Sequence, residues 1–254
     1  MMLVVATATI SAAHATFMSD MWWKPDESGW GANVVQQEEI SFITVFVYNV
    51  SGEPIWYVAP NARQIALTAS GLPVLYGKLY RTRGPWLSGV FDPTKVAIAA
   101  EGHIIIEAIN SSDASFQYQI DGLVVNKRVT RQTWKTVTSF PAVFDYFAAM
   151  HLIKRTPNDV QTSITMSGSF TADIDRGVAR FTYRATDKEC IYTGAITQTG
   201  KFSSVNGIFG CNNGEIGGVV FNELEINRHG FTSQVTLTEG TTISSGTIAG
   251  AKRR

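Results

Sequence analysis

The chain has 254 residues, of which 44% are hydrophobic and only 17% are charged. Its 21 acidic and 21 basic residues balance and neither sign forms a long run, so the sequence offers no basic surface for nucleic acid or for an anionic membrane. A low charge content with 22 glycines is typical of short strands joined by turns, rather than of disorder or coiled coil.

The first fifteen residues are apolar and uncharged, and they end in Ala13-His14-Ala15, the small-x-small pattern that signal peptidase cleaves. We therefore interpret residues 1–15 as a signal peptide and expect a periplasmic or secreted protein. The alternative is an apolar first strand, because the positive charge that opens most signal peptides is missing. No later segment has the ~20 consecutive apolar residues of a membrane helix, so we expect no transmembrane segment in the mature chain.

Residues 20–135 show the two-residue period of β-strands. An apolar run at 40–48 is followed by turn residues at 49–54 and by a second strand-like run at 55–59, which predicts a hairpin. Three further strands are expected, at 72–81, 103–109 and 115–126. Sequential hairpins protect their edges most simply by closing on themselves, so we predict an N-terminal up-and-down (meander) β-barrel of about eight strands.

The period changes in residues 136–168, where apolar groups recur at helical spacing between Val143 and Lys154. We expect a linker with one short helix here. Alternation of apolar and polar residues returns in 169–238, which predicts a smaller C-terminal antiparallel β module. The tail 239–254 is rich in Thr, Ser, Gly and Ala, and we expect it to be disordered. The predicted fold class is therefore all-β apart from the linker.

The two cysteines of the chain, Cys190 and Cys211, lie in strand-like runs that a turn-rich segment separates. Neighbouring strands can bring them side by side, and an oxidising compartment favours a disulfide between them. Closing a loop of about 20 residues would stabilise the fold by about 3 kcal/mol. A pair of buried free thiols is the alternative. There is no zinc-ligand spacing and no Cys-x-x-Cys redox motif, so we expect no metal site and no cofactor.

Residues 22–31 read Trp-Trp-Lys-Pro-Asp-Glu-Ser-Gly-Trp-Gly, and the strand pair that follows them ends in Glu-Pro-Ile-Trp-Tyr at 53–57. This WWxPxESGWG signature resembles a group of poorly characterised exported proteins of proteobacteria. The segment around the two cysteines resembles the C-terminal part of the same proteins. The first module is also similar, more weakly, to the avidin and streptavidin barrel. Lys24 stands where the ligand-binding Asn of that family would be, so the resemblance implies a meander barrel with an aromatic mouth.

Tryptophans are the most conspicuous candidate ligand contacts, because the indole ring is a large flat apolar surface with one polar N–H. All six lie in or near the first module, at positions 22, 23, 30, 56, 86 and 134. They either fill the barrel core or form a platform at its mouth for a sugar ring or a flat heterocycle. For the platform we predict contacts from the signature and its paired strand, with two polar residues as hydrogen-bonding partners: Trp23, Trp30, Trp56, Tyr57, Glu27 and Ser28.

Catalytic motifs of hydrolases are missing from the sequence, and we predict no catalytic residue. His103, His151 and His229 occur singly, and the adjacent Asp26 and Glu27 would face opposite ways in a strand. We therefore predict a non-enzymatic exported protein that binds a small molecule or a glycan. The alternatives are a structural or interaction protein with a partner in the bacterial envelope, and a hydrolase with an unrecognised site.

Overall fold

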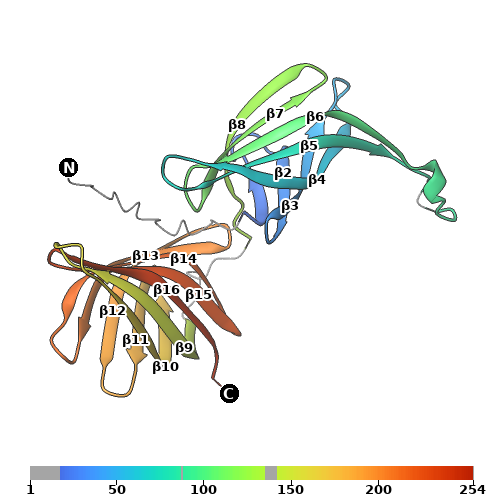
Figure 1. Ribbon diagram of the computed structural model, residues 1–254. Coiled ribbons are helices and arrows are strands. Elements are labelled where there is room, and N and C mark those ends of the chain that lie inside the picture. Colours follow the sequence, from blue (N-terminus) through green and yellow to red (C-terminus); the bar gives the residue numbers. More distant parts are fainter. Residues whose placement is uncertain (1–17, 87, 135–141, 254) are drawn as a thin grey trace, which may run out of the picture. The chain divides into compact units, whose positions relative to one another are not determined.

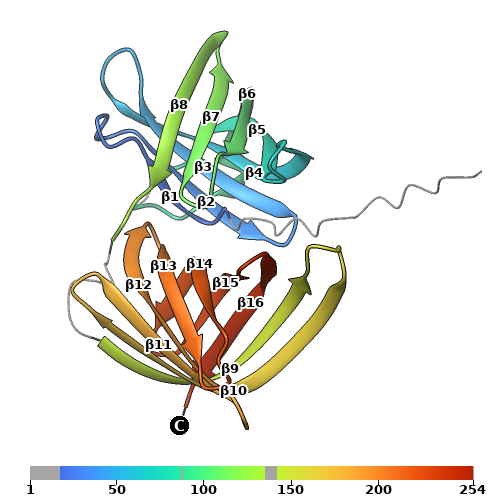
Figure 2. The same ribbon diagram turned by 90° about the vertical axis from the view of Figure 1, so that its left-hand side faces the viewer.

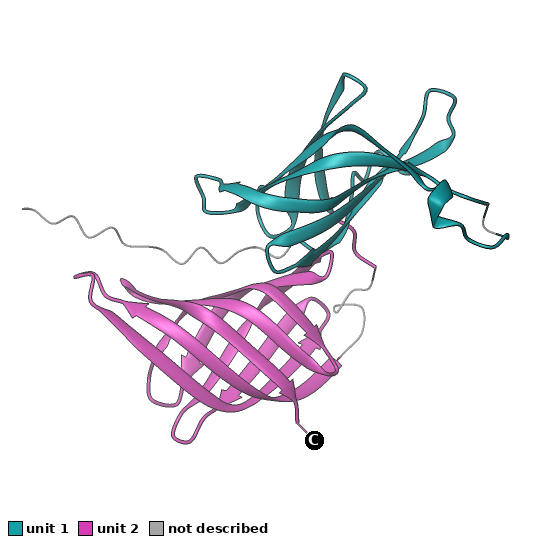
Figure 3. Cartoon of the chain, turned by 45° about the vertical axis from the view of Figure 1, so that its right-hand side comes forward, with its two compact units in different colours: residues 1–130 teal, residues 131–254 magenta. Residues whose placement is uncertain are grey.

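A computed structural model describes residues 18–86, 88–134 and 142–253. The predicted signal peptide lies outside these residues. The chain divides into two compact units, residues 1–130 and 131–254, drawn in teal and magenta in Figure 3. The described strands form two closed barrels of eight antiparallel strands each. The all-β class and the eight-stranded meander barrel expected in the first half are therefore confirmed.

Barrel 1 is a meander, in which every strand pairs with the next one along the chain (Figure 1). Its strands are β1 (Asp20–Trp23), β2 (Gly31–Gln37), β3 (Ile40–Tyr48), β4 (Pro54–Leu67), β5 (Pro73–Arg83), β6 (Ala97–Ala108), β7 (Asp113–Ile120) and β8 (Leu123–Arg131). A short 3₁₀ turn, η1 (Pro93–Lys95), lies in the connection between β5 and β6. Because consecutive strands are antiparallel, the β1–β2, β3–β4, β5–β6 and β7–β8 connections share one end of the barrel, which we call the signature end.

The interior of barrel 1 is packed by alternate residues of its strands. On β7, Ala114, Phe116 and Tyr118 are buried, whereas Gln117 between them is exposed. The ring of Trp22 on β1 is fully buried and lies 5.8 Å from that of Phe116, centroid to centroid. Each fully buried large side chain of this kind contributes about 1.5–3 kcal/mol of transfer free energy, so the inward faces provide most of the stabilisation.

Barrel 2 also follows chain order, and its last strand pairs with its first to close the sheet (Figure 2). Its strands are β9 (Ala142–Arg155), β10 (Gln161–Asp175), β11 (Val178–Arg184), β12 (Glu189–Thr199), β13 (Phe202–Cys211), β14 (Ile216–Asn227), β15 (Gly230–Glu239) and β16 (Thr242–Lys252). The expectation of a smaller C-terminal sheet is therefore wrong, because eight strands between 142 and 252 close on themselves.

The predicted helix between Val143 and Lys154 is wrong, since these residues belong to strand β9. Tyr146, Met150 and the residues between them explain the error: side chains four apart share one face in a strand as well as in a helix. The buried residues of β9 are in fact two apart, at 146, 148, 150 and 152. Hydrogen bonding to β10 on one side and to β16 on the other decides the strand. Residues 135–141 of the predicted linker lie outside the described residues.

The predicted disorder of 239–254 is also wrong, because Thr242–Lys252 forms strand β16. This strand pairs along its length with β15 and with β9, so its backbone groups are satisfied on both edges. Ser244 and Ile248 face the interior and are buried. Small and hydroxylated residues suit such a strand, although their composition alone is typical of a flexible tail.

Glycines allow barrel 2 to bend sharply where strands approach each other. A Cβ atom on Gly207 would lie 2.0 Å from the carbonyl oxygen of Thr193, and one on Gly246 would lie 1.9 Å from that of His151. Both contacts are with backbone, which cannot move aside within a paired strand. Only glycine therefore permits this curvature, as is usual where small barrels turn a corner.

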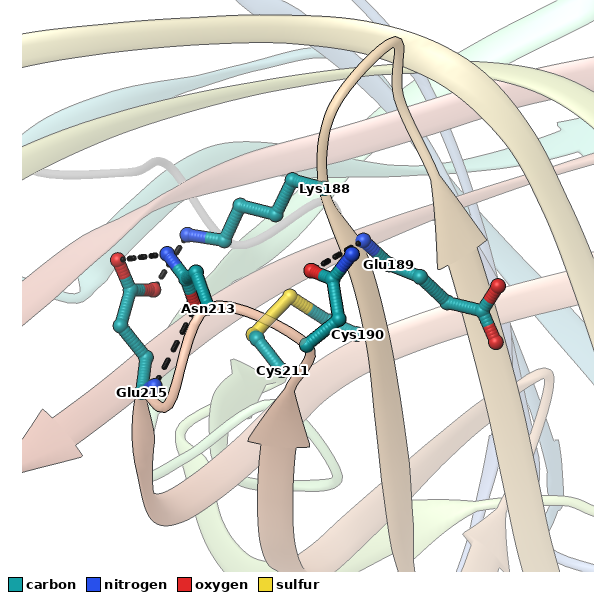
Figure 4. The surroundings of a disulfide bond; sticks show 7 residues. Lys188, Glu189, Cys190, Cys211, Asn213 and Glu215 are labelled. Carbon is teal, nitrogen blue, oxygen red and sulfur yellow. Dashed lines mark hydrogen bonds and ion pairs between the residues drawn. A yellow bond between two sulfur atoms is a disulfide. The ribbon is translucent and has the colours of Figure 1, made fainter.

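Aromatic rings fill barrel 2. Phe170 and Phe231 stack with ring centroids 4.4 Å apart, and Phe181 and Phe221 make an edge contact at 5.1 Å. The predicted disulfide is confirmed: Cys190 on β12 and Cys211 on β13 are directly opposite and bonded (Figure 4). It closes a loop of 21 residues within barrel 2.

Removing the disulfide with the double change Cys190→Ala and Cys211→Ala should lower the free energy of unfolding of barrel 2 by about 3 kcal/mol, because the denatured chain regains loop entropy. The measurement is urea denaturation followed by far-UV circular dichroism. As a control, the native tryptophan emission should stay unchanged, because five of the six tryptophans lie in residues 1–130. An unaltered urea midpoint would show that the hairpin needs no cross-link.

Replacing Tyr183 with Phe should stabilise barrel 2 by about 1 kcal/mol, because the buried Tyr183 hydroxyl has no hydrogen-bond partner among the described residues. Tyr146→Phe is the matched control, since its hydroxyl donates a 2.6 Å hydrogen bond to the carbonyl of Asn227. That change should destabilise the barrel by about the same amount. Equal effects of both substitutions in thermal denaturation would contradict the prediction.

Candidate functional site

Ion pairs fix the β1–β2 connection, residues 24–30, at the signature end. Lys24 Nζ lies 2.7 Å from the Asp26 carboxylate and 2.8 Å from Glu27 Oε1. The other carboxylate oxygen of Glu27 accepts a hydrogen bond from Lys127 on β8. Backbone hydrogen bonds add turns: the Glu27 amide donates to the Lys24 carbonyl at 2.9 Å, and the Trp30 amide donates to the Glu27 carbonyl at 3.2 Å. The contact between Glu27 and Lys127 thus holds the loop against β8.

Both lysines keep Glu27 ionised. The hydrogen bond from Lys127, and then that from Lys24, holds the pKa of Glu27 below its ordinary value. In turn, the hydrogen bonds to Asp26 and Glu27 raise the pKa of Lys24. Because each of its carboxylate oxygens already has a lysine partner, Glu27 holds the loop in place and has little capacity left for a ligand.

Trp30 packs against residues of the barrel 1 core and does not form an open platform. Its indole Nε1 donates a 3.0 Å hydrogen bond to the Tyr118 hydroxyl, and the two rings are stacked 6.4 Å apart. The ammonium group of Lys127 lies 5.3 Å from the centre of the indole ring, on its face. Burial raises the pKa of Tyr118, which keeps its hydroxyl neutral. Trp30 is only partly exposed and belongs to the packing around the core.

The remaining predicted contacts separate onto different surfaces. Tyr57 on β4 faces the interior and is 6% exposed, whereas its neighbour Trp56 faces outward and is 53% exposed. Trp23 likewise follows the buried Trp22 on β1, so it lies on the outer face. Ser28 is exposed in the loop. The six residues predicted from the sequence are therefore not brought together in one pocket.

Tyr57 belongs to a group of polar residues at the signature end that the sequence analysis did not identify. Burial raises the pKa of its phenol, and the negative charges of Glu101 and Asp121 raise it further. The positive charge of Arg81 on β5 acts in the opposite direction. A side-chain hydrogen bond with Glu101 also raises the pKa of Tyr57, so the hydroxyl stays protonated at neutral pH and faces Glu101.

Glu101 is the least satisfied member of this group. On β6, Gly102 pairs with Leu79 and Ala100 pairs with Tyr80, so the bulge between them leaves Glu101 without a cross-strand partner. Its Oε2 atom is buried and has no hydrogen-bond partner among the described residues. The sequence contained one signal for this residue: it is the single carboxylate within the apolar run 96–106.

A second polar cluster lies in barrel 2 beside the disulfide (Figure 4). A cavity of about 40 Å³ is lined by the disulfide and by two lysines and two glutamates, at positions 154, 188, 215 and 239. Burial tends to raise the pKa of Glu215, but hydrogen bonds from Lys188 and Asn213 outweigh it and the pKa is lowered. Lys154 lies 3.8 Å from Glu239. The charges are paired and the space holds little more than a water molecule, so this cluster is structural.

Histidines do not join either cluster as metal ligands. His151 contacts the hydroxyl of Thr165 at 3.0 Å, and His103 lies beside the ring of Tyr76. Within 18–86, 88–134 and 142–253, no three His, Cys, Asp or Glu side chains are placed to hold a metal ion. Across the same ranges, no helix has both the length and the apolar character that crossing a membrane requires.

Comparison with known proteins adds no family. No protein-family model matches the chain. A comparison with curated proteins finds no match. The two resemblances implied a barrel and further properties. The structure supports the barrel architecture.

Glu27→Gln should make the stability of the signature end less dependent on acid pH. A carboxylate whose pKa is lowered by folding stabilises above its ordinary value of 4.5 and loses this contribution as pH falls through the lowered value. The thermal midpoint, measured by tryptophan fluorescence between about pH 7 and about pH 3, should thus fall less steeply in the variant than in the wild type. Glu107→Gln, an exposed position on β6, is the control. Parallel curves for all three proteins would refute the role of Glu27.

Proposed function

We propose that this chain is an exported, non-enzymatic binding protein whose first barrel binds a small molecule at the signature end. The ligand carries a positively charged hydrogen-bond donor, such as an ammonium or guanidinium group, that pairs with Glu101. The observation that carries this proposal is the buried Oε2 atom of Glu101, which has no hydrogen-bond partner in the part of the chain that the structure describes.

The free-energy cost of leaving Glu101 Oε2 without a partner supports a ligand beside this atom. A buried acceptor without a partner costs about 1–3 kcal/mol, and more when it is charged, so the fold retains Glu101 at a penalty. A donor from a ligand would remove that penalty and form a charge-assisted hydrogen bond. Proteins tend to keep such unsatisfied groups where they serve binding or chemistry.

Neighbouring groups define the rest of the ligand. Arg81 forms no ion pair with Glu101 or Asp121 among the described residues, so its guanidinium is available to a ligand acceptor or carboxylate. The neutral hydroxyl of Tyr57, which hydrogen-bonds to Glu101, borders the same site. Opposite charges at separate positions suit a compact zwitterionic molecule better than an apolar one.

Export is supported by the leader-like residues 1–15 and by the disulfide. Disulfides persist in the periplasm and outside the cell, whereas the cytosol keeps thiols reduced. We accordingly propose a periplasmic or secreted location for the binding protein.

A second candidate function is contact with an envelope partner through barrel 2, because its interior is filled and only its outside is free to bind. Ile208 and Ile216, which are 70% and 73% exposed, border a groove of about 770 Å³ on the outer face of β12, β13 and β14. An exposed apolar groove of this kind is typical of contact surfaces.

Glu101→Gln tests the small-molecule site, because it removes the charge and keeps the shape. We would titrate the protein with agmatine, cadaverine, L-arginine and glycine betaine, and with biotin and urea as uncharged probes, following tryptophan fluorescence and the thermal midpoint. At least one cationic probe should bind saturably, and the variant should bind it about tenfold or more weakly. The unliganded variant should be as stable as the wild type or more stable, because a strained buried charge is removed.

Glu107→Gln is again the matched control, since it makes the same change on the same strand at an exposed position. It should bind the probe like the wild type. Failure of every cationic probe to bind, or equal affinity of the wild type and Glu101→Gln, would overturn the proposal.

A further inference from the structure

Strand register places three aromatic residues in one row on the outer face of barrel 1. Trp23 on β1 is opposite Gly31 on β2, Gly31 is opposite Phe46 on β3, and Phe46 is opposite Trp56 on β4. Directly opposite residues share a face of the sheet. The row therefore runs across four neighbouring strands, perpendicular to them.

The rings of this row are accessible. Phe46 is 40% exposed and Trp56 is 53% exposed, while Trp23 is partly exposed. An exposed aromatic ring offers a large apolar contact area to a ligand. Other aromatic rings fill the interior of barrel 1. The rings of Trp23, Phe46 and Trp56 are therefore accessible to a ligand on the outside.

A polar row lies beside the aromatic one, two residues further along each strand. Asn33 on β2 is opposite Thr44 on β3, and Met21 and Val58 flank them on β1 and β4. The side chains of Asn33 and Thr44 form no hydrogen bond within the described part of the chain. Asn offers two donors and an acceptor in one plane, and Thr offers a hydroxyl. Free hydrogen-bonding groups thus border the rings.

Gly31 leaves a space in the aromatic row that the backbone does not require. Its φ angle is not positive, and an added Cβ would meet only the Trp22 carbonyl oxygen, at 3.4 Å, beyond its chain neighbours. A Cβ atom would therefore be accommodated at this position. Since neighbouring strands are about 4.8 Å apart, Trp23 and Phe46 lie about 10 Å apart across Gly31, which is itself buried.

We propose that Trp23, Gly31, Asn33, Thr44, Phe46 and Trp56 form a second binding site, the outer platform, for a neutral glycan. A pyranose ring has an apolar face of C–H groups, which stacks on an aromatic ring, and a rim of hydroxyls, which pairs with amides and alcohols. The platform presents both kinds of group side by side. Rings spaced along the outer face of the barrel suit successive sugars of one chain.

The absence of charged side chains from the platform favours a neutral glycan over nucleic acid or anionic lipid. Neither row contains an acidic or basic residue. Nucleic acid and anionic lipid are bound largely through Lys and Arg, which the platform does not provide. An uncharged ligand rich in hydroxyls is the class whose groups match the side chains present. The site is separate from Glu101, which faces the other side of the sheet.

The test uses the full-length mature chain and three neutral oligosaccharides: cellohexaose, chitohexaose and maltohexaose. Isothermal titration calorimetry would measure the affinity of the wild type and of Trp56→Ala, Gly31→Val and Asn33→Leu. One oligosaccharide should bind saturably, and each substitution should weaken its binding by about tenfold or more, through loss of stacking, filling of the gap, or loss of hydrogen bonds.

Trp86→Ala is the matched control, because it removes another exposed tryptophan, in the β5–β6 connection. It should leave the affinity unchanged, and circular dichroism should show that all variants stay folded. The proposal is overturned if none of the three oligosaccharides binds, if Gly31→Val binds like the wild type, or if Trp86→Ala weakens binding as much as Trp56→Ala. Glu101→Gln should not alter oligosaccharide binding, which separates this site from the small-molecule site.

Discussion

Closure of each eight-stranded sheet on itself is the constraint on which the other features depend. A closed sheet has no free edge, so every strand is paired on both sides and successive side chains must alternate between inside and outside. This alternation decides what each residue of a signature can do. Trp22 enters the core while Trp23 lies outside, and Tyr57 enters while Trp56 lies outside.

Each barrel contains a carboxylate oxygen that is buried without a hydrogen-bond partner among the described residues, on Glu101 in barrel 1 and on Asp175 in barrel 2. In barrel 2 the lysines and glutamates beside the disulfide are paired with one another. At the signature end of barrel 1, Glu27 is paired with lysines, whereas the Oε2 atom of Glu101 is buried without a partner. Pairing lowers the cost of burial, so a buried carboxylate oxygen without a partner is a reasonable place to look for a function. Asp175 also pairs with Arg176, whereas Glu101 forms no ion pair among the described residues.

Strand β4 connects the two proposed sites. Tyr57 contributes to the polar group inside the barrel, and the adjacent Trp56 contributes to the outer platform. The ion-paired loop 24–30 stands between them, because it begins directly after Trp23 and ends with Trp30, which packs on Tyr118. Because Tyr57 and Trp56 are adjacent on β4, a ligand at either site would lie near Trp56, so tryptophan fluorescence is a suitable probe for both.

Sequence alone determined the features that depend on local pattern. The two-residue period of strands identified the all-β class, and the length of the first half gave about eight strands for barrel 1, although the segment 115–126 is divided between β7 and β8. The placement of Cys190 and Cys211 in strand-like runs predicted the disulfide. Only the tertiary structure decided features that depend on distant partners. Residues 142–155 became a strand because β10 and β16 pair with them, and 242–252 became ordered for the same reason. The bulge at Glu101 and the register that places the outer platform across four strands depend on pairing between strands, which the order of residues does not show.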